Sequence, residues 1–246
     1  MYFKAIILAL ASLAVGAASA QTVNLVKNGD FEQTSNGPNK ELRYQTVVTG
    51  WNSTGYNFVY AQGAADTIGA TTTTPGTTLK LWGPGSGSDN GLTSSPTGGN
   101  FIAADGGYEV SPISQTINGL VAGQQYVVGF DWAAAQQSGF TGATSENWTV
   151  SLGAEKYTTA TVQNASHGFV PWMHEAMTFT ATGASQVLSF LAQGTPTGQP
   201  PFSLLDNVTM MAAVSPVPEP SSWAMMAGGL GLLGFMARRK RAAKQA

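Results

Sequence analysis

Residues able to perform acid–base or metal chemistry are few in this chain. His167 and His174 could serve a metal site only with carboxylates supplied from elsewhere in the sequence. The chain has no cysteine and no HExxH, GxSxG, P-loop or dinucleotide motif, which removes thiol catalysis and several motif-based enzyme classes. The sequence therefore predicts a protein without catalytic residues, which is not an enzyme.

Acidic residues leave one enzymatic alternative open. Glu109, Glu146, Glu155 and Glu175 could include a glycosidase pair, which requires two carboxylates about 5 to 10 Å apart across a cleft. Because separation in space cannot be read from the sequence, a secreted glycan-processing enzyme, a glycoside hydrolase or lyase, is kept as the alternative.

Tryptophan side chains are the stronger indication of ligand binding, because a flat indole can stack on a sugar ring. Trp132 and Trp148 alternate with apolar neighbours and are expected in the core. Trp82 and Trp172 lie beside Gly and Pro at loop edges, so we predict that these two bind ligand. The alternative is that they close the ends of a sandwich.

The elements that must position these residues are strands. Apolar and polar residues alternate in short segments, as in Tyr126–Trp132, which is typical of antiparallel strands with one buried face. We expect an all-β fold, an antiparallel two-sheet β-sandwich of the jelly-roll kind, flanked by an N-terminal signal helix and a C-terminal hydrophobic helix. Further expected strands are Thr46–Gly50, Asn57–Ala61, Leu79–Trp82, Phe101–Ala104, Ile113–Ile117, Trp148–Leu152, Lys156–Val162, Met177–Ala181, Leu188–Ala192 and Phe202–Met210.

Two turn-rich stretches, Gly83–Asn100 and Thr195–Pro201, are rich in Gly, Ser and Pro and are expected to be loops. The low-complexity run Thr71–Thr74 is expected to be exposed.

Residues 21 to 217 include five basic and twelve acidic residues, so this part carries a net charge of −7. An acidic surface lacks the positive footprint that phosphate contacts need, which excludes nucleic acid as an expected partner.

The N-terminus has the order of a secretory signal peptide. Lys4 precedes an apolar run, and the run ends in small residues at Ala18-Ser19-Ala20. We therefore predict a signal peptide at residues 1–20, cleaved before Gln21. The apolar run is shorter than the roughly 20 residues that a membrane span needs.

The C-terminus combines three features. Pro218-Glu219-Pro220 is followed by an apolar stretch and then by the basic residues Arg238, Arg239, Lys240 and Arg241. This order resembles the PEP-CTERM sorting signal of Gram-negative bacteria. The resemblance implies that the secretion machinery exports the chain and that an exosortase cuts near the motif. The chain then divides into the signal peptide, a β-sandwich domain at 21–213 and a linker with sorting signal at 214–246.

The apolar stretch of the tail is about 15 residues long and contains several glycines, whereas a span takes about 17 to 25 residues. We expect it to hold the chain in the inner membrane transiently, as a transmembrane helix with its basic end in the cytoplasm, and the mature protein to reach the envelope or the exterior. The alternative is a retained single-pass anchor.

The middle of the chain resembles galactose-binding-like jelly-roll domains, which include many carbohydrate-binding modules. The resemblance rests on the opening segment Asn24–Glu32, on Gly50-Trp51, and on the closing segment Leu205–Val208. It implies a surface or matrix protein associated with exopolysaccharide or another glycan.

The same resemblance implies a structural calcium ion between Glu32 and Asp206. By strand parity Asp206 would share a face with Leu204, Val208 and Met210, and a carboxylate facing a core needs a cation or several N–H donors. The alternative is that Asp206 caps a turn, or that a bulge turns it outward.

Overall fold

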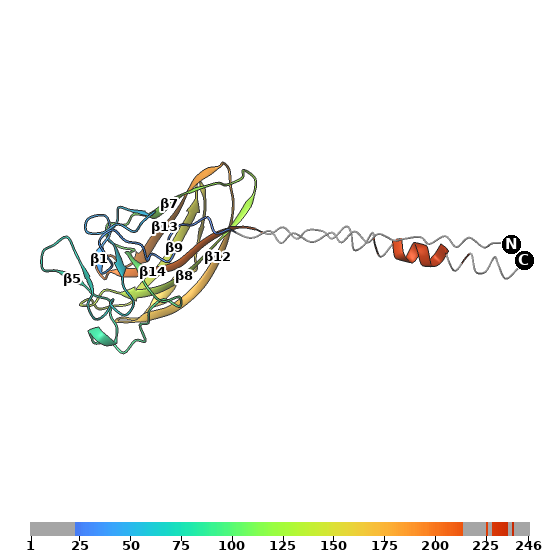
Figure 1. Ribbon diagram of the computed structural model, residues 1–246. Coiled ribbons are helices and arrows are strands. Elements are labelled where there is room, and N and C mark those ends of the chain that lie inside the picture. Colours follow the sequence, from blue (N-terminus) through green and yellow to red (C-terminus); the bar gives the residue numbers. More distant parts are fainter. Residues whose placement is uncertain (1–22, 214–224, 226–227, 236–237, 239–246) are drawn as a thin grey trace, which may run out of the picture. The chain divides into compact units, whose positions relative to one another are not determined.

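The computed structural model describes residues 23–213, 225, 228–235 and 238 (Figure 1). The chain divides into two compact units, Met1–Ala213 and Val214–Ala246. The predicted signal peptide lies outside the described residues, as does Pro218-Glu219-Pro220. Of the second unit, residues 228–235 are helical. Within the described ranges, no helix combines the length and the apolar character that a bilayer crossing requires.

Two sheets form the first unit, which confirms the predicted all-β sandwich. The larger sheet has the order β12-β8-β14-β6-β3-β1-β4-β5, and the smaller has β10-β9-β13-β7-β2 with β11 also paired to β9. The pairs are antiparallel except β1 with β4. The strands are β1 Lys40–Glu41, β2 Asn52–Ser53, β3 Asn57–Tyr60, β4 Ala70–Thr71, β5 Thr78–Leu79, β6 Phe101–Asp105, β7 Ile113–Asn118, β8 Gln125–Gln136, β9 Thr144–Leu152, β10 Glu155–Thr158, β11 Val162–Asn164, β12 Phe169–Thr180, β13 Ser185–Thr195 and β14 Pro201–Ala212.

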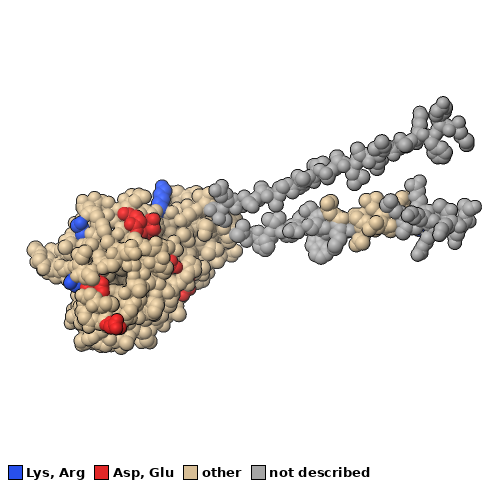
Figure 2. Space-filling view, turned by 60° about the horizontal axis from the view of Figure 1, so that its bottom comes forward, with Lys and Arg blue, Asp and Glu red and all other residues tan. Residues whose placement is uncertain are grey.

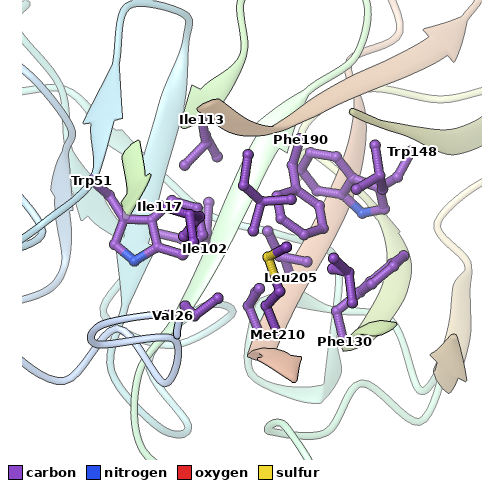
Figure 3. Packing of buried hydrophobic residues seen from close by; sticks show 14 of the residues in the cluster. Val26, Trp51, Ile102, Ile113, Ile117, Phe130, Trp148, Phe190, Leu205 and Met210 are labelled. Carbon is purple, nitrogen blue, oxygen red and sulfur yellow. The ribbon is translucent and has the colours of Figure 1, made fainter. Parts of the chain in front are cut away.

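The main hydrophobic core lies between the two sheets (Figure 3). Phe190 is at its centre, with ring centroids 5.2 Å from Phe130, 6.1 Å from Trp148 and 6.2 Å from Trp51. Trp148 belongs to β9, whose even-numbered residues are all buried, as alternation predicts. The expected core positions Trp132 and Trp148 are confirmed.

A second hydrophobic cluster covers the outer face of the larger sheet. On β6, Ile102 and Ala104 point into the main core, whereas Phe101 and Ala103 belong to the second cluster. Chain from residues 65 to 81 closes this cluster with Ala65, Ala70, Leu79 and Leu81. The larger sheet is therefore buried on both faces along its central strands.

Three strand predictions are corrected. Leu79–Trp82 is a strand only at its first residue, because β5 ends at Leu79 and Leu81 makes an isolated bridge to Gln137. Thr46–Gly50 is no strand: it makes isolated bridges only, and it ends in a turn in which Trp51 N–H donates to the Val48 carbonyl at 3.0 Å and Gly50 has a φ of 86°. Lys156–Val162 is interrupted, because β10 and β11 pair with different parts of β9. The stretch 83–100 contains no strand, as expected, but has a short 3-10 helix at Pro84–Ser86.

Candidate functional site

A cavity of about 610 Å³ opens in the first unit where several connecting segments meet the ends of β1, β3, β6, β8 and β14. We call it the acidic cavity. Its lining residues are Glu41, Tyr44, Tyr56, Thr72, Thr73, Thr74, Thr77, Asp105, Gly107, Tyr108, Glu109, Gln137, Phe140, Thr197, Gly198, Pro200 and Pro201. The lining thus combines four aromatic rings and three carboxylates, and among the residues that the structure describes it includes no Lys or Arg.

Tyr56 anchors the aromatic part of the acidic cavity. Its ring packs edge-on against Phe58 at 4.7 Å and against Tyr108 at 5.3 Å between centroids. Its backbone is fixed on both sides, because Tyr56 N–H donates to the Glu109 carbonyl at 3.2 Å and the Tyr56 carbonyl accepts from Asp105 N–H at 3.1 Å. The rings are therefore held in place by the sheet rather than by loops alone.

The turn after β6 brings Tyr108 to the cavity. Gly106 N–H donates to the Pro201 carbonyl at 2.9 Å, and a Cβ at Gly106 would lie 2.5 Å from the backbone nitrogen of Gly194. Only glycine permits this approach of the turn to β13. Tyr108 itself is 55% exposed.

Asp105 is the most unusual acidic group in the cavity. The residue is 2% exposed, and its Oδ1 accepts from Gly107 N–H at 2.7 Å and Tyr108 N–H at 3.0 Å. Its Oδ2 is buried and has no hydrogen-bond partner within the described part of the chain. Burial raises the pKa of Asp105 to about 6, although the two N–H donors act in the opposite direction.

Glu41 and Tyr56 complete the inner wall. Glu41 is 2% exposed, and its Oε2 accepts from Thr73 N–H at 2.9 Å. Burial, together with the nearby charges of Glu41 and Asp105, raises the pKa of Tyr56 to about 12. The Tyr56 hydroxyl thus stays protonated and can donate a hydrogen bond at any physiological pH.

The rim presents exposed rings. Tyr44 and Phe140 lie with Tyr108 around the opening, and Arg43 lies over the Tyr44 ring at 4.8 Å from the centroid. A hydrogen bond to Glu109 raises the pKa of the Tyr108 hydroxyl. Rings for stacking beside oxygens that accept hydroxyl or ammonium protons are typical of sites for small polar molecules.

The predicted ligand residues Trp82 and Trp172 do not line this cavity. Trp82 is half-buried: its ring lies on His167 with centroids 4.1 Å apart, and its Nε1–H donates to the Phe140 carbonyl at 2.8 Å. Trp172 is also half-buried, with an edge-on contact to Phe101 at 5.6 Å and a bond to the Thr93 carbonyl at 3.2 Å. Their role in binding stays a prediction.

The predicted calcium residues Glu32 and Asp206 both contact the segment between residues 95 and 100. Glu32 Oε1 accepts from Asn100 N–H at 2.5 Å. Asp206 Oδ2 accepts from the hydroxyls of Ser95 and Thr97, and its Oδ1 is buried without a partner among the described residues. Burial raises the pKa of Asp206 to about 6.

The parity argument for Asp206 was wrong in part. A bulge shifts the register of β14 between Asp206 and Thr209, and Asn207 has a φ of 52°. Val208 and Met210 therefore face the main core, whereas Leu204 and Asp206 lie on the other face of the sheet. Asp206 is nevertheless fully buried, because Ser95 and Thr97 cover it.

The two histidines have separate environments. His167 lies against Trp82, whereas His174 Nδ1 pairs with Asp131 Oδ1 at 2.8 Å. Of the four glutamates considered for a glycosidase pair, only Glu109 lines the acidic cavity. No group of three or more His, Asp or Glu able to hold a metal occurs within the ranges that the structure describes.

The C-terminal segment has a known counterpart. Residues 216–241 match the PEP-CTERM protein-sorting motif. The tail is a PEP-CTERM sorting signal. The resemblance is thereby confirmed, and the PEP-CTERM motif indicates export, exosortase processing and sorting to the cell envelope. Of the basic residues, Arg238 is described and is exposed, while Arg239, Lys240 and Arg241 lie outside the described residues.

Carbohydrate-binding modules are among the solved structures that are similar to this chain. A CBM61 module in complex with β-1,4-galactotriose is 15% identical, with 78% of this chain and 99% of that chain covered and a TM-score of 0.41. The CBM22-1 xylan-binding domain of Paenibacillus barcinonensis Xyn10C is 12% identical, with 80% and 99% covered and a TM-score of 0.40. Similarity at this level assigns no ligand to the chain.

One curated relative matches in sequence. Halomucin of Haloquadratum walsbyi is 26% identical over 210 residues, or 82% of this chain. The chain spans only about 2% of the length of that protein.

Apart from Glu109, which was considered for a glycosidase pair, the residues of the acidic cavity were missed in the sequence, because they come from segments far apart in the chain. One local signal was present: Asp105 ends an apolar strand and is followed by Gly106-Gly107-Tyr108, which places an acid and an aromatic ring on one tight turn. Thr71–Thr74, expected to be exposed, includes the buried Thr72 and supplies part of the cavity wall.

Proposed function

We propose that the exported domain is a non-catalytic cell-surface or matrix protein that binds extracellular polysaccharide in the acidic cavity. The lining carries the proposal: exposed Tyr44, Tyr108 and Phe140 offer faces for sugar rings, and carboxylate and hydroxyl oxygens lie beside them. The sorting signal supports a location at the cell envelope, where the domain would meet extracellular polysaccharide.

The surface charge limits which polymers bind directly. Figure 2 shows that most of the face in view is uncharged, with a few acidic and basic side chains on it. With a net charge of −7 over residues 21–217, the domain repels a polyanion at low salt unless calcium bridges the two. Binding to an acidic polysaccharide is therefore expected to require calcium, and binding to an uncharged one is not.

Affinity electrophoresis tests the proposal. The purified protein is run through gels containing single polysaccharides, with and without calcium, and the same polymers are then analysed for shortened products. Retention without products supports the proposal, whereas no retention on any polysaccharide contradicts it.

A glycoside hydrolase is the second candidate, and the acidic cavity contains an observation that favours it. Glu41, Asp105 and Glu109 line one cavity, and a carboxyl with a raised pKa, such as Asp105, is what a general acid requires. If shortened oligosaccharides appear in the same assay, the domain is a glycoside hydrolase and not a non-catalytic binding protein.

A structural calcium ion between Glu32 and Asp206 is part of the proposal. Asp206 supports such an ion, because its Oδ1 is buried with no partner in the described chain, while its Oδ2 accepts from the hydroxyls of Ser95 and Thr97. Calcium takes six to eight oxygen ligands, among them carboxylates, carbonyls and water. The ion would hold the segment 95–100 against β14.

Calcium removal is expected to lower the melting temperature, because an ion bound only by the folded state stabilises it by mass action. The variant Asp206→Asn should be insensitive to chelator. In chelator it should be at least as stable as the wild type, because it removes a buried carboxylate whose pKa is raised. Thermal melts of both proteins with and without chelator decide this. Identical wild-type melts in calcium and in chelator would show that Asp206 only binds Ser95 and Thr97.

Processing at both ends is the third part of the proposal. The apolar tail holds the chain in the inner membrane until an exosortase cuts near Pro218–Pro220. The mature protein recovered from cells should therefore begin at Gln21 and lack residues after Pro220. Intact-mass spectrometry measures both ends. A mature species that retains Arg238–Arg241 would show a permanent anchor instead.

A further inference from the structure

We propose that the acidic cavity selects saccharides that carry a free amino group, so that its natural ligand is an amino-sugar polymer with protonated amines. The inference rests on the proposed function and narrows the substrate class of the same site. It follows from the charges, the rings and one unpartnered oxygen of the cavity.

Charge is the first argument. Glu41, Asp105 and Glu109 line the cavity, and the described lining contains no basic side chain. The Arg43 guanidinium lies over the ring of Tyr44, which lines the cavity. A neutral ligand that fills the cavity displaces the water that hydrates these carboxylates and does not compensate their charge. An anionic ligand is in addition repelled by the carboxylates. A cationic ligand compensates the charge that it desolvates.

The unpartnered oxygen is the second argument. Asp105 is 2% exposed, and its Oδ2 has no hydrogen-bond donor in the described chain, whereas Oδ1 has two. A buried carboxylate oxygen without a donor is costly. An ammonium group brings three donors and a positive charge, which is the complement of such an oxygen.

The aromatic rings are the third argument. Tyr44, Tyr56, Tyr108 and Phe140 surround the same space as the carboxylates. The faces of aromatic rings attract cations, and cages of aromatic rings recognise ammonium ligands. Arg43 already uses the Tyr44 ring in this way at the rim.

The test compares two oligosaccharides that differ only in their amines. The β-1,4-linked tetramer of glucosamine and that of N-acetylglucosamine are titrated calorimetrically into the full chain, purified in a detergent without a sugar headgroup. The titrations are run at about pH 6.5, where part of the amines still carries a proton and the carboxyl of Asp105, whose pKa is about 6, is mostly ionised. We expect the free-amine tetramer to bind at least about tenfold tighter at low salt, and this preference to shrink at high salt.

Two variants locate the preference. Glu109→Gln removes an exposed carboxylate of the cavity rim and should reduce the preference several-fold. Asp89→Asn changes the net charge equally, but Asp89 is exposed and does not line the cavity, so the preference should be unchanged.

Four outcomes overturn the inference. Equal or tighter binding of the N-acetylated tetramer removes the amine selectivity while the proposed function stands. An equal loss in both variants assigns the preference to bulk charge. Failure of both tetramers to bind, while polysaccharide gels retain the protein, shows a glycan site of another kind; failure in both assays removes the proposed function as well.

Discussion

Replacement of Glu146 by Gln is expected to raise the stability of the folded protein by ~3 kcal/mol at pH 7. Glu146 lies on β9, is completely buried, and has an Oε2 without a partner among the described residues. Burial raises its pKa to about 8 from the usual 4.5, although the side chains of Thr144 and Asn164 lower it. The folded protein therefore holds this carboxyl protonated at neutral pH.

The pH dependence follows from this pKa. Because the folded pKa is raised, the contribution of Glu146 to stability is fully present below the unfolded pKa of about 4.5 and is lost as pH rises through about 8. Gln has the same shape and stays neutral at every pH. The advantage of Glu146→Gln should therefore be small at acidic pH, grow through neutrality and level off above about pH 8.

Urea unfolding of the wild type and Glu146→Gln across this pH range measures the effect. Asp89→Asn is the control, because it removes an exposed carboxylate and should leave the pH profile unchanged. Parallel profiles for wild type and Glu146→Gln, or a destabilised Gln variant at alkaline pH, would show that the buried carboxyl is ionised and compensated in the folded state.

The second large effect is expected at Tyr108. Tyr108→Ala removes an exposed ring from the rim of the acidic cavity, together with its contact to Tyr56. Because the ring is more than half exposed, stability should change little, whereas affinity for polysaccharide should fall about tenfold or more.

Trp82→Ala and Trp172→Ala are the matched comparison. Both rings pack against neighbours, Trp82 on His167 and Trp172 on Phe101, so their removal should lower stability by roughly 2 kcal/mol and leave binding within about twofold. Gel retention and thermal melts of the three variants separate the two effects. Loss of retention in a tryptophan variant with Tyr108→Ala unaffected would place the ligand at the predicted tryptophans instead.

The larger part of the fold follows from local alternation. In β9 the pattern around Trp148, Val150 and Leu152 is that of a strand with one buried face, and the structure has that strand. Alternation fails in β6, where every residue from Phe101 to Asp105 is buried, because chain from residues 65 to 81 covers the outer face of the sheet. A strand that is covered on both faces shows no alternation of buried and exposed residues.

The candidate site was less predictable for two physical reasons. Tyr44, Tyr108 and Pro201 become neighbours of one cavity only through the sheet order, which no local pattern encodes. At Asp206 a single bulge reversed the face of the residues that follow, so strand parity counted from one end gave the wrong partners. One local pattern did indicate the site: Asp105 ends a strand and is followed by a tight turn that leads to Tyr108.

The most direct measurement is an NMR titration of the isotope-labelled protein with an oligosaccharide from a polysaccharide that retains it. We predict that chemical shifts change first at the backbone amides of Gly107, Tyr108 and Thr73, which line the acidic cavity and donate to Asp105 and Glu41. The amides and indole N–H groups of Trp82 and Trp172 should change little. Shifts centred on these two tryptophans, with the cavity amides unchanged, would contradict the assignment of the acidic cavity as the glycan site.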